Sequence, residues 1–213
     1  MTGLLKFLFF LIVIRPLVLV FLGLNVRHGE HLPQEGPAII VANHNSHLDT
    51  MVLMSLFPFG LLARLRPVAA ADYFLRTPFL AWFALKIIGI IPLERKASTG
   101  SGDIFAELTD AIKRGDILIL FPEGTRGEPE NMVEFKKGIS YLAERHPDVP
   151  VVPVFLHGLG KSLPKGAWVP VPFFCDIYVG EAILWTGERT AFMEMVAERV
   201  KQLSEEGYIA PWE

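Results

Sequence analysis

An apolar run meets a polar cluster in the stretch Ala38-Ile39-Ile40-Val41-Ala42-Asn43-His44-Asn45-Ser46-His47-Leu48-Asp49. The apolar part has the length and composition of a buried strand. Ser46 and Asp49, three residues apart, are typical of a pair that caps the N-terminus of a helix. The stretch therefore predicts a strand, a loop that carries His44, and a helix that begins at Ser46 and runs toward Pro58.

Similar units recur on both sides of this stretch. Five further apolar runs have the length of strands: Pro67 to Ala71, Ile90 to Leu93, Ile117 to Phe121, Val151 to Phe155 and Cys175 to Val179. Helical spacing appears between Asp103, a candidate N-cap, and Gly115, a candidate stop, and again from Phe192 to Leu203. In a chain of 213 residues, this alternation predicts an α/β fold. We expect a single-domain sandwich over residues 31–213, with a central mixed, mostly parallel sheet flanked by helices.

The segment from Tyr73 to Ile91 carries more apolar side chains than one core-facing stripe requires. Thr77-Pro78 is a typical start for a helix within it. Two alternatives stay open for the additional apolar groups. They pack in the core, or they form a surface near Trp82 that meets a bilayer or an acyl chain.

Residues 1–30 are predicted to be an apolar helical membrane anchor. Three interruptions break its apolar segment: Lys6, the pair Arg15-Pro16, and Gly23. The halves Leu4 to Ile14 and Leu17 to Val26 are each too short to cross about 30 Å of hydrocarbon as a helix. This favours two short helices lying in one leaflet, with a single span as the alternative. A cleaved signal peptide fits least, because no small-residue cleavage site follows the apolar run. In either arrangement three cations are available to anionic headgroups: Lys6, Arg15 and Arg27.

The overall composition favours a globular enzyme attached to a membrane. Hydrophobic residues make up 51% of the chain, without the repeated long spans of a polytopic protein. The formal net charge of -3 argues against a general affinity for nucleic acid. Cys175 is the only cysteine, so no intrachain disulfide is possible, and its strand-like surroundings favour a buried thiol over a catalytic one. We expect the protein on the cytoplasmic face of a membrane, which is the inner membrane in a bacterium.

His44 precedes the predicted helix and can fold back over its first turn toward Asp49. A carboxylate that accepts one imidazole N–H leaves the other ring nitrogen to take a proton from a substrate hydroxyl. Such a pair requires no serine or cysteine nucleophile. In a second interpretation Asp49 is only a helix cap and His44 a hydrogen-bonded loop histidine. In a third, His44, His47 and Asp49 bind a metal in a lipid hydrolase, although no further His or Cys cluster completes the ligand shell.

Four blocks, in order over roughly Pro37 to Gly158, resemble the lysophosphatidate and glycerol-3-phosphate acyltransferase family. They are the Asn-His-x-Ser-x-x-Asp block at Asn43 to Asp49, Gly89 to Arg95, Phe-Pro-Glu-Gly-Thr-Arg at Phe121 to Arg126, and Val152-Pro153-Val154. Each block alone is weak, but their order and spacing are specific. Two residues depart from the family pattern: Pro92, where an aromatic residue is frequent, and Gly127, where a serine is common. Both departures lie beside the expected acceptor site.

The resemblance implies an O-acyltransferase of phospholipid biosynthesis in which His44 and Asp49 form the catalytic dyad. It implies that five residues hold the glycerol phosphate of the acceptor: Arg95, Glu123, Gly124, Thr125 and Arg126. Guanidinium groups suit this role because they bind phosphate oxygens bidentately, and Lys136 is a further candidate cation. The implied donor is acyl-CoA or acyl carrier protein, the implied acceptor is lysophosphatidate or a related lysophospholipid, and no metal or other cofactor is required. A non-catalytic membrane adaptor is the remaining alternative, and it predicts that His44→Ala leaves function intact.

Overall fold

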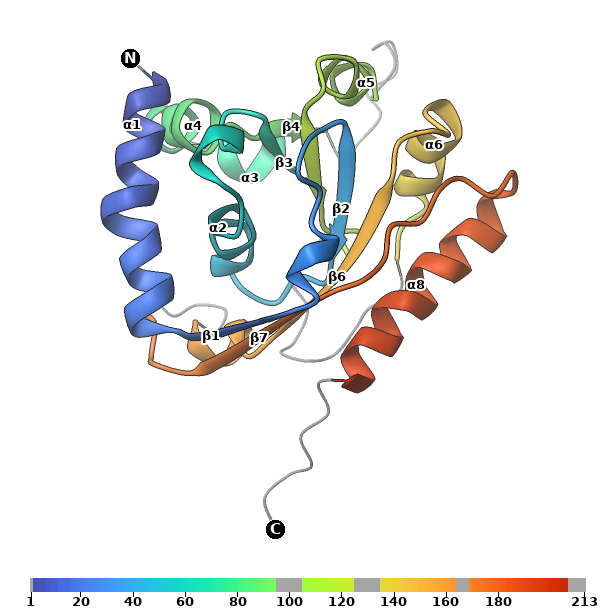
Figure 1. Cartoon of the computed structure of the whole chain (residues 1–213). Coiled ribbons are helices and arrows are strands. Elements are labelled where there is room, and N and C mark those ends of the chain that lie inside the picture. The colour runs from blue at the N-terminus through green and yellow to red at the C-terminus, as the bar shows by residue number, and fades with distance from the viewer. Residues whose placement is uncertain (1, 95–104, 125–134, 164–168, 207–213) are drawn as a thin grey trace.

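The computed structural model describes residues 2–94, 105–124, 135–163 and 169–206, which form a seven-stranded sheet with helices on both faces (Figure 1). The strands are β1 (Gly23–Arg27), β2 (Ala38–Ala42), β3 (Leu65–Ala70), β4 (Ile91–Leu93), β5 (Ile117–Leu120), β6 (Val151–His157) and β7 (Phe174–Val179). Their order is β1-β7-β6-β2-β5-β3-β4. All neighbours are parallel except β6 and β7. The predicted mixed, mostly parallel sheet is confirmed.

Strand β2 shows why the sheet is covered on both faces. Its five residues are completely buried. Ala38, Ile40 and Ala42 belong to one apolar core, while Ile39 and Val41 belong to a second one. Successive strand residues point to opposite faces, so an unbroken apolar run is what a strand between two helical layers requires.

One helical layer packs on each core. The first contains α2 (Leu48–Ser55), η5 (Phe83–Ile88) and an N-terminal helix built from α1 (Thr2–Phe9), η1 (Phe10–Ile14) and η2 (Leu17–Phe21). In the same region α4 (Pro78–Trp82) packs against η5, and α3 (Ala71–Phe74) contacts β3 and β4. The second layer contains α5 (Ala106–Lys113), α6 (Gly138–Arg145) and α8 (Arg189–Glu206). Shorter helical turns are η3 (Gly29–His31), η4 (Phe59–Leu61) and α7 (Leu159–Ser162). Figure 1 shows the two layers on opposite sides of the sheet.

The six predicted strands are present with end shifts of one or two residues, but β1 was not predicted. The expected helix over Leu17 to Val26 is wrong for its last residues, because Gly23 to Arg27 pair with Phe174 to Tyr178 as a parallel edge strand. The phenyl ring of Phe174 lies so close over Gly23 that a Cβ atom there would meet it at 2.8 Å. Pairing with a distant strand therefore overrides the local apolar pattern.

The N-terminal helix is one continuous element. It runs from Thr2 to Val20 without the predicted break at Pro16, and it is long and apolar enough to cross a membrane. Wide π-helical turns lie on both sides of Pro16. They relieve the clash that a proline ring makes with the preceding turn of an α-helix. One side of the helix packs on the domain through buried residues spaced by four, Lys6, Phe10, Ile14 and Val18, and Leu22 continues this stripe directly after the helix.

Two cations of this helix point toward the domain. The buried Lys6 Nζ donates to the Ile88 carbonyl oxygen at 2.9 Å, at the C-terminal end of η5. Burial and then the charge of Arg66 lower the pKa of Lys6 to about 8. The Arg15 guanidinium lies 3.8 Å from the centre of the Phe59 ring. The prediction that Lys6, Arg15 and Arg27 are available to lipid headgroups is thus wrong for Lys6, which is buried. Arg15 contacts the domain, and for Arg27, which is exposed at the end of β1, the prediction stays open.

The helix predicted at Thr77-Pro78 is confirmed, since Thr77 Oγ1 accepts a hydrogen bond from the Leu80 N–H at 3.3 Å. The extra apolar residues of this region divide between the two alternatives. Ala84, Ile87 and Ile88 are core residues, whereas Phe79, Trp82 and Leu85 are exposed. The helix over Ala106–Lys113 ends as predicted before Gly115, whose φ of +76° suits glycine, while the candidate cap Asp103 lies outside the described residues.

Candidate active site

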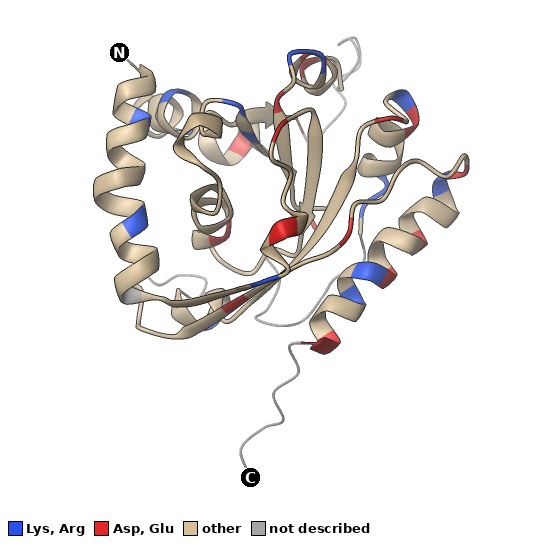
Figure 2. Ribbon diagram, viewed as in Figure 1, with Lys and Arg blue, Asp and Glu red and all other residues tan. Residues whose placement is uncertain are grey.

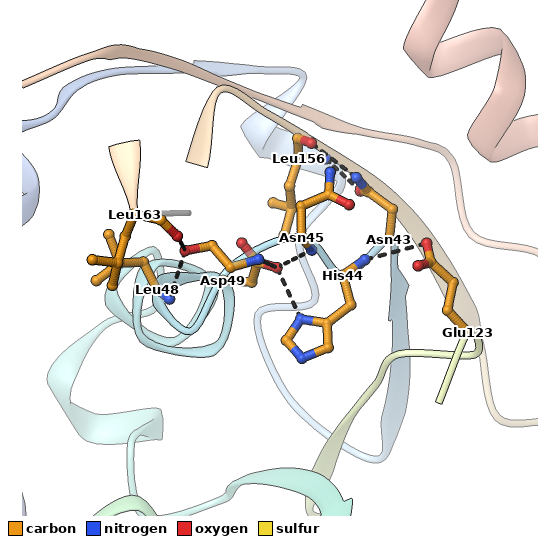
Figure 3. A network of polar contacts seen from close by, with 9 residues as sticks. Asn43, His44, Asn45, Leu48, Asp49, Glu123, Leu156 and Leu163 are labelled. Atoms are coloured by element: carbon orange, nitrogen blue, oxygen red, sulfur yellow. Dashed lines mark hydrogen bonds and ion pairs between the residues drawn. The ribbon is translucent and has the colours of Figure 1, made fainter. Parts of the chain in front are cut away.

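The loop after β2 is tied to the neighbouring strand by Asn43. Its side-chain amide donates to the Leu156 carbonyl oxygen at 2.9 Å, and its side-chain oxygen accepts from the Leu156 N–H at 2.7 Å (Figure 3). The amide thus continues the ladder between β2 and β6 by one more pair. This contact fixes the point from which the polar loop leaves the sheet.

The carboxylate of Asp49 organises this loop. Asp49 is completely buried in the first turn of α2, and its Oδ2 accepts hydrogen bonds from the Asn45 and Ser46 N–H groups at 2.7 and 2.8 Å. Ser46 Oγ in turn accepts from the Leu48 N–H at 3.2 Å. The predicted pair of Ser46 and Asp49 is therefore joined at the start of α2, although the helix begins at Leu48 and not at Ser46.

The same carboxylate oxygen holds His44. Its Nδ1 lies 2.9 Å from Asp49 Oδ2 (Figure 3). Because a carboxylate can only accept, Nδ1 carries the proton of this bond, and Nε2 of a neutral ring becomes the acceptor. One carboxylate oxygen of Asp49 thus bonds both the loop before the helix and the ring of His44.

Strand β5 brings further groups to His44. Val41 of β2 pairs with Leu120 of β5, so parallel chains that continue in step place residue 44 near residue 123. Glu123 Oε1 accepts a hydrogen bond from the His44 backbone N–H at 3.3 Å. The Phe121 ring stacks on the imidazole, with 4.2 Å between ring centres. Sequence reasoning missed this stacking, which the register of β2 and β5 explains.

Glu123 is an acid in an apolar setting. It is 3% exposed, and its Oε2 has no hydrogen-bond partner among the described residues. Burial raises the pKa of this carboxyl to about 7, the nearby charge of Asp49 adds to the rise, and the His44 N–H opposes it. The side chain is therefore close to the balance between its neutral and charged forms at neutral pH.

Gly124, the residue after Glu123, lies against the side chain of Lys136. Gly124 has a φ of +69°, and the Lys136 side chain crosses the place that a Cβ atom would occupy. The Lys136 N–H donates to the Pro122 carbonyl oxygen at 3.0 Å. The structure thus gathers three of the predicted acceptor-binding residues near His44: Glu123, Gly124 and Lys136. The other three, Arg95, Thr125 and Arg126, lie outside the described residues, so their role stays a prediction.

A cavity of about 730 Å³ opens beside His44. This volume is within the range of small-molecule sites. Its lining is mostly apolar and comes from both helical layers, including Met51, Phe74, Phe83, Leu108 and Leu142. The lining includes six polar or charged side chains: His44, His47, Thr50, Tyr73, Glu94 and Lys136. The cavity thus combines a largely apolar lining with His44 among its few polar residues.

The geometry gives no support to the metal-site interpretation. His47 turns to Tyr73, with 3.4 Å between Nε2 and the phenol oxygen, while His44 turns to Asp49. Within the described ranges, no three His, Cys, Asp or Glu side chains gather as a ligand set. Cys175 is buried in β7, and burial raises the pKa of its thiol to about 12, which fits the predicted inert thiol.

Comparison with known proteins agrees with this geometry. The acyltransferase family pattern matches residues 23–157. The chain is 33% identical to the chloroplastic 1-acyl-sn-glycerol-3-phosphate acyltransferase of Arabidopsis thaliana, over 69% of this chain and 39% of that protein. It is 30% identical to the 1-acyl-sn-glycerol-3-phosphate acyltransferase of Pseudomonas aeruginosa, over 77% and 60% of the two chains. The chain thus spans less than two thirds of the length of these relatives.

A solved structure shares the fold. The 1-acyl-sn-glycerophosphate acyltransferase of Thermotoga maritima superimposes with a TM-score of 0.74, at 23% identity, over 93% of this chain and 77% of that one. The family pattern covers more than half of the chain and includes the loop of His44 and Asp49. The chain belongs to the acyltransferase family.

Proposed function

We propose that this protein transfers a fatty acyl group from a thioester donor to the free hydroxyl of lysophosphatidate or a related lysophospholipid. The observation that carries the proposal is the His44–Asp49 pair at the edge of a largely apolar cavity. The relatives named above are 1-acyl-sn-glycerol-3-phosphate acyltransferases, which supports lysophosphatidate as the first candidate acceptor.

In the proposed mechanism His44 Nε2 takes the proton of the acceptor hydroxyl, while Asp49 stabilises the resulting imidazolium. The hydroxyl oxygen bonds to the thioester carbonyl carbon, and the tetrahedral intermediate then loses its C–S bond. The thiolate leaves and takes the proton from His44, so the base is regenerated. Exchange of a thioester for an ester changes no oxidation state, and the proposal includes no cofactor.

The acceptor end is assigned to the rim formed by Glu123, Gly124 and Lys136. Lys136 supplies a cation beside the cavity. Arg95 and Arg126 are expected to bind the phosphate bidentately through their guanidinium groups. The proposed donor is acyl-CoA or acyl carrier protein. Both carry the same thioester, so the proposed chemistry is the same for either one.

The first experiment measures product formation from labelled acyl-CoA or acyl carrier protein with lysophosphatidate, lysophosphatidylcholine or glycerol 3-phosphate. We expect transfer to lysophosphatidate, and a fall of about 10²- to 10⁴-fold in His44→Ala. His28→Ala is the matched control, because this histidine is exposed on the surface and pairs with Glu206. An undiminished rate in His44→Ala, in a folded protein, would exclude His44 as the base, whereas absence of transfer by the wild type with every acceptor would favour the adaptor alternative.

We also propose that the protein lies on one leaflet at the cytoplasmic face of a membrane. The outward side of the N-terminal helix is apolar, with Leu4, Ile12, Leu19 and Val20 among its exposed residues. Its only two charged residues, Lys6 and Arg15, contact the domain. Figure 2 shows how sparse charge is on this helix compared with α8. A helix packed on the domain along one side, with an apolar opposite side, suits in-plane insertion better than a span.

A further inference from the structure

One set of polar side chains in the cavity is unused by the proposed chemistry. His44 is the base, Lys136 belongs to the acceptor rim, and Glu94 adjoins the expected phosphate ligand Arg95. The remaining polar lining consists of His47, Thr50 and Tyr73. We call these three residues the polar wall.

The polar wall is built from two elements. His47 directly precedes α2 and Thr50 lies in its first turn, three residues on, so both side chains lie on the same side of the helix. Tyr73 comes from α3, after β3, and its hydroxyl lies 3.4 Å from His47 Nε2. The two rings stack with 6.0 Å between their centres. The Arg76 guanidinium lies 4.6 Å from the Tyr73 ring centre and its Nε donates to the Tyr73 carbonyl oxygen, which fixes the ring.

The location of the wall distinguishes it from the acceptor rim. The rim lies on the β5 side of His44, where Lys136 brings a charged group to the cavity. The wall lies on the α2 side and presents a hydroxyl, a phenol and an imidazole. Neighbouring residues of the same elements, Met51 and Phe74, add apolar lining. A two-substrate transfer requires both partners to be oriented at one base, and the cavity provides a polar group on each side of it.

Resting on the proposed function, we propose that the polar wall binds the pantetheine arm of the thioester donor, with Tyr73 as its main hydrogen-bonding residue. This arm is uncharged and carries amide groups next to the thioester, which match neutral donors and acceptors in an otherwise apolar cavity. A phosphate would instead require fixed cations, as on the opposite rim. Because the arm is common to CoA and acyl carrier protein, the wall serves either donor.

The test is steady-state kinetics of Tyr73→Phe with acyl-CoA, acyl carrier protein and acyl-pantetheine as donors. Loss of one neutral hydrogen bond should raise KM by about two- to tenfold for all three donors. The KM for lysophosphatidate should not change. Tyr141→Phe is the matched control, because Tyr141 is 39% exposed on α6 and does not line the cavity.

Three results would overturn the inference: an increase confined to the KM of the acceptor, an effect seen with acyl-CoA alone, or no effect at all. Calorimetry with a thioether analogue of acyl-pantetheine tests the wall independently of catalysis. Weaker binding to Tyr73→Phe than to wild type supports the wall even if the acceptor is misidentified, whereas equal binding refutes it. Absence of transfer by the wild type with every acceptor would refute the proposed function and leave the calorimetric result to decide the wall.

Discussion

At the scale of single residues, Glu123 links the loop of His44 to the sheet. It accepts the backbone N–H of His44, while burial keeps the pKa of its carboxyl near 7. Between its unfolded and folded pKa values, this carboxyl keeps its proton in the folded protein but has lost it in the unfolded chain. The folded protein therefore becomes less stable as pH rises from about 4.5 to about 7.

Glu123→Gln should remove this pH dependence. Between about pH 5 and about pH 8, we expect the variant to gain stability relative to the wild type, on the order of 1–3 kcal/mol. Urea unfolding at both pH values measures the difference. Glu181→Gln is the control, since the Glu181 side chain is exposed. A difference between Glu123→Gln and wild type that is the same at both pH values would refute the assigned pKa shift.

Gly124 carries a prediction about the acceptor rim. An alanine there must adopt a left-handed backbone and displace the Lys136 side chain. We expect Gly124→Ala to raise the KM for lysophosphatidate about tenfold while the KM for the donor stays unchanged, as measured by steady-state kinetics. Gly60→Ala has open space around the new methyl group and should match the wild type. An unchanged KM for lysophosphatidate in Gly124→Ala would mean that Lys136 does not bind the acceptor.

The contact between His44 and Asp49 was predictable from the sequence because their spacing is local: a carboxylate in the first turn lies within reach of the loop that precedes its own helix. The contacts of His44 with Phe121 and Glu123 follow from the pairing of β2 with β5, which no local pattern reveals. The contact between Tyr73 and His47 could not be predicted from the sequence, because it depends on how α3 and α2 are placed relative to each other in the fold.

At the scale of elements, the N-terminal helix is a structural part of the domain. Local hydropathy predicts a membrane element here, but the buried stripe and the pairing of β1 with β7 depend on distant residues. The break expected at Pro16 does not occur, because wide turns accommodate the ring. Strand positions were predictable because both faces of β2 and β5 are buried, which leaves an unbroken apolar run.

This packing predicts a stability effect. Phe10→Ala removes a ring that is buried between the helix and the domain, and it should lower the free energy of unfolding by about 3–5 kcal/mol. Ile12→Ala, at a side chain that is 65% exposed on the same helix, should change it by less than about 0.5 kcal/mol. Thermal and urea unfolding of the purified proteins measure both values. Equal effects would mean that the helix does not dock on the domain in solution.

At the scale of the whole molecule, exposed apolar side chains lie on the outer side of the N-terminal helix and also on α4, where Phe79 is 75% exposed. Ile12→Glu or Phe79→Glu should weaken binding to vesicles of phosphatidylcholine and phosphatidylglycerol, because burial of a charge in the membrane interface is costly. Leu184→Glu, at an exposed residue of the segment after β7, is the control. Sedimentation with vesicles measures binding. Unchanged binding of Phe79→Glu would favour attachment through the helix alone.

The central claim for the whole molecule is that His44 acts as a base because Asp49 orients it. The most direct measurement compares acyl transfer to lysophosphatidate by wild type, Asp49→Asn, His44→Ala and the double variant, each checked for cooperative unfolding. Residues that act as one unit give non-additive losses. We predict that each single variant loses about 10²-fold or more and that the double variant is no slower than His44→Ala. A near-wild-type rate in Asp49→Asn, or losses that multiply in the double variant, would contradict the account.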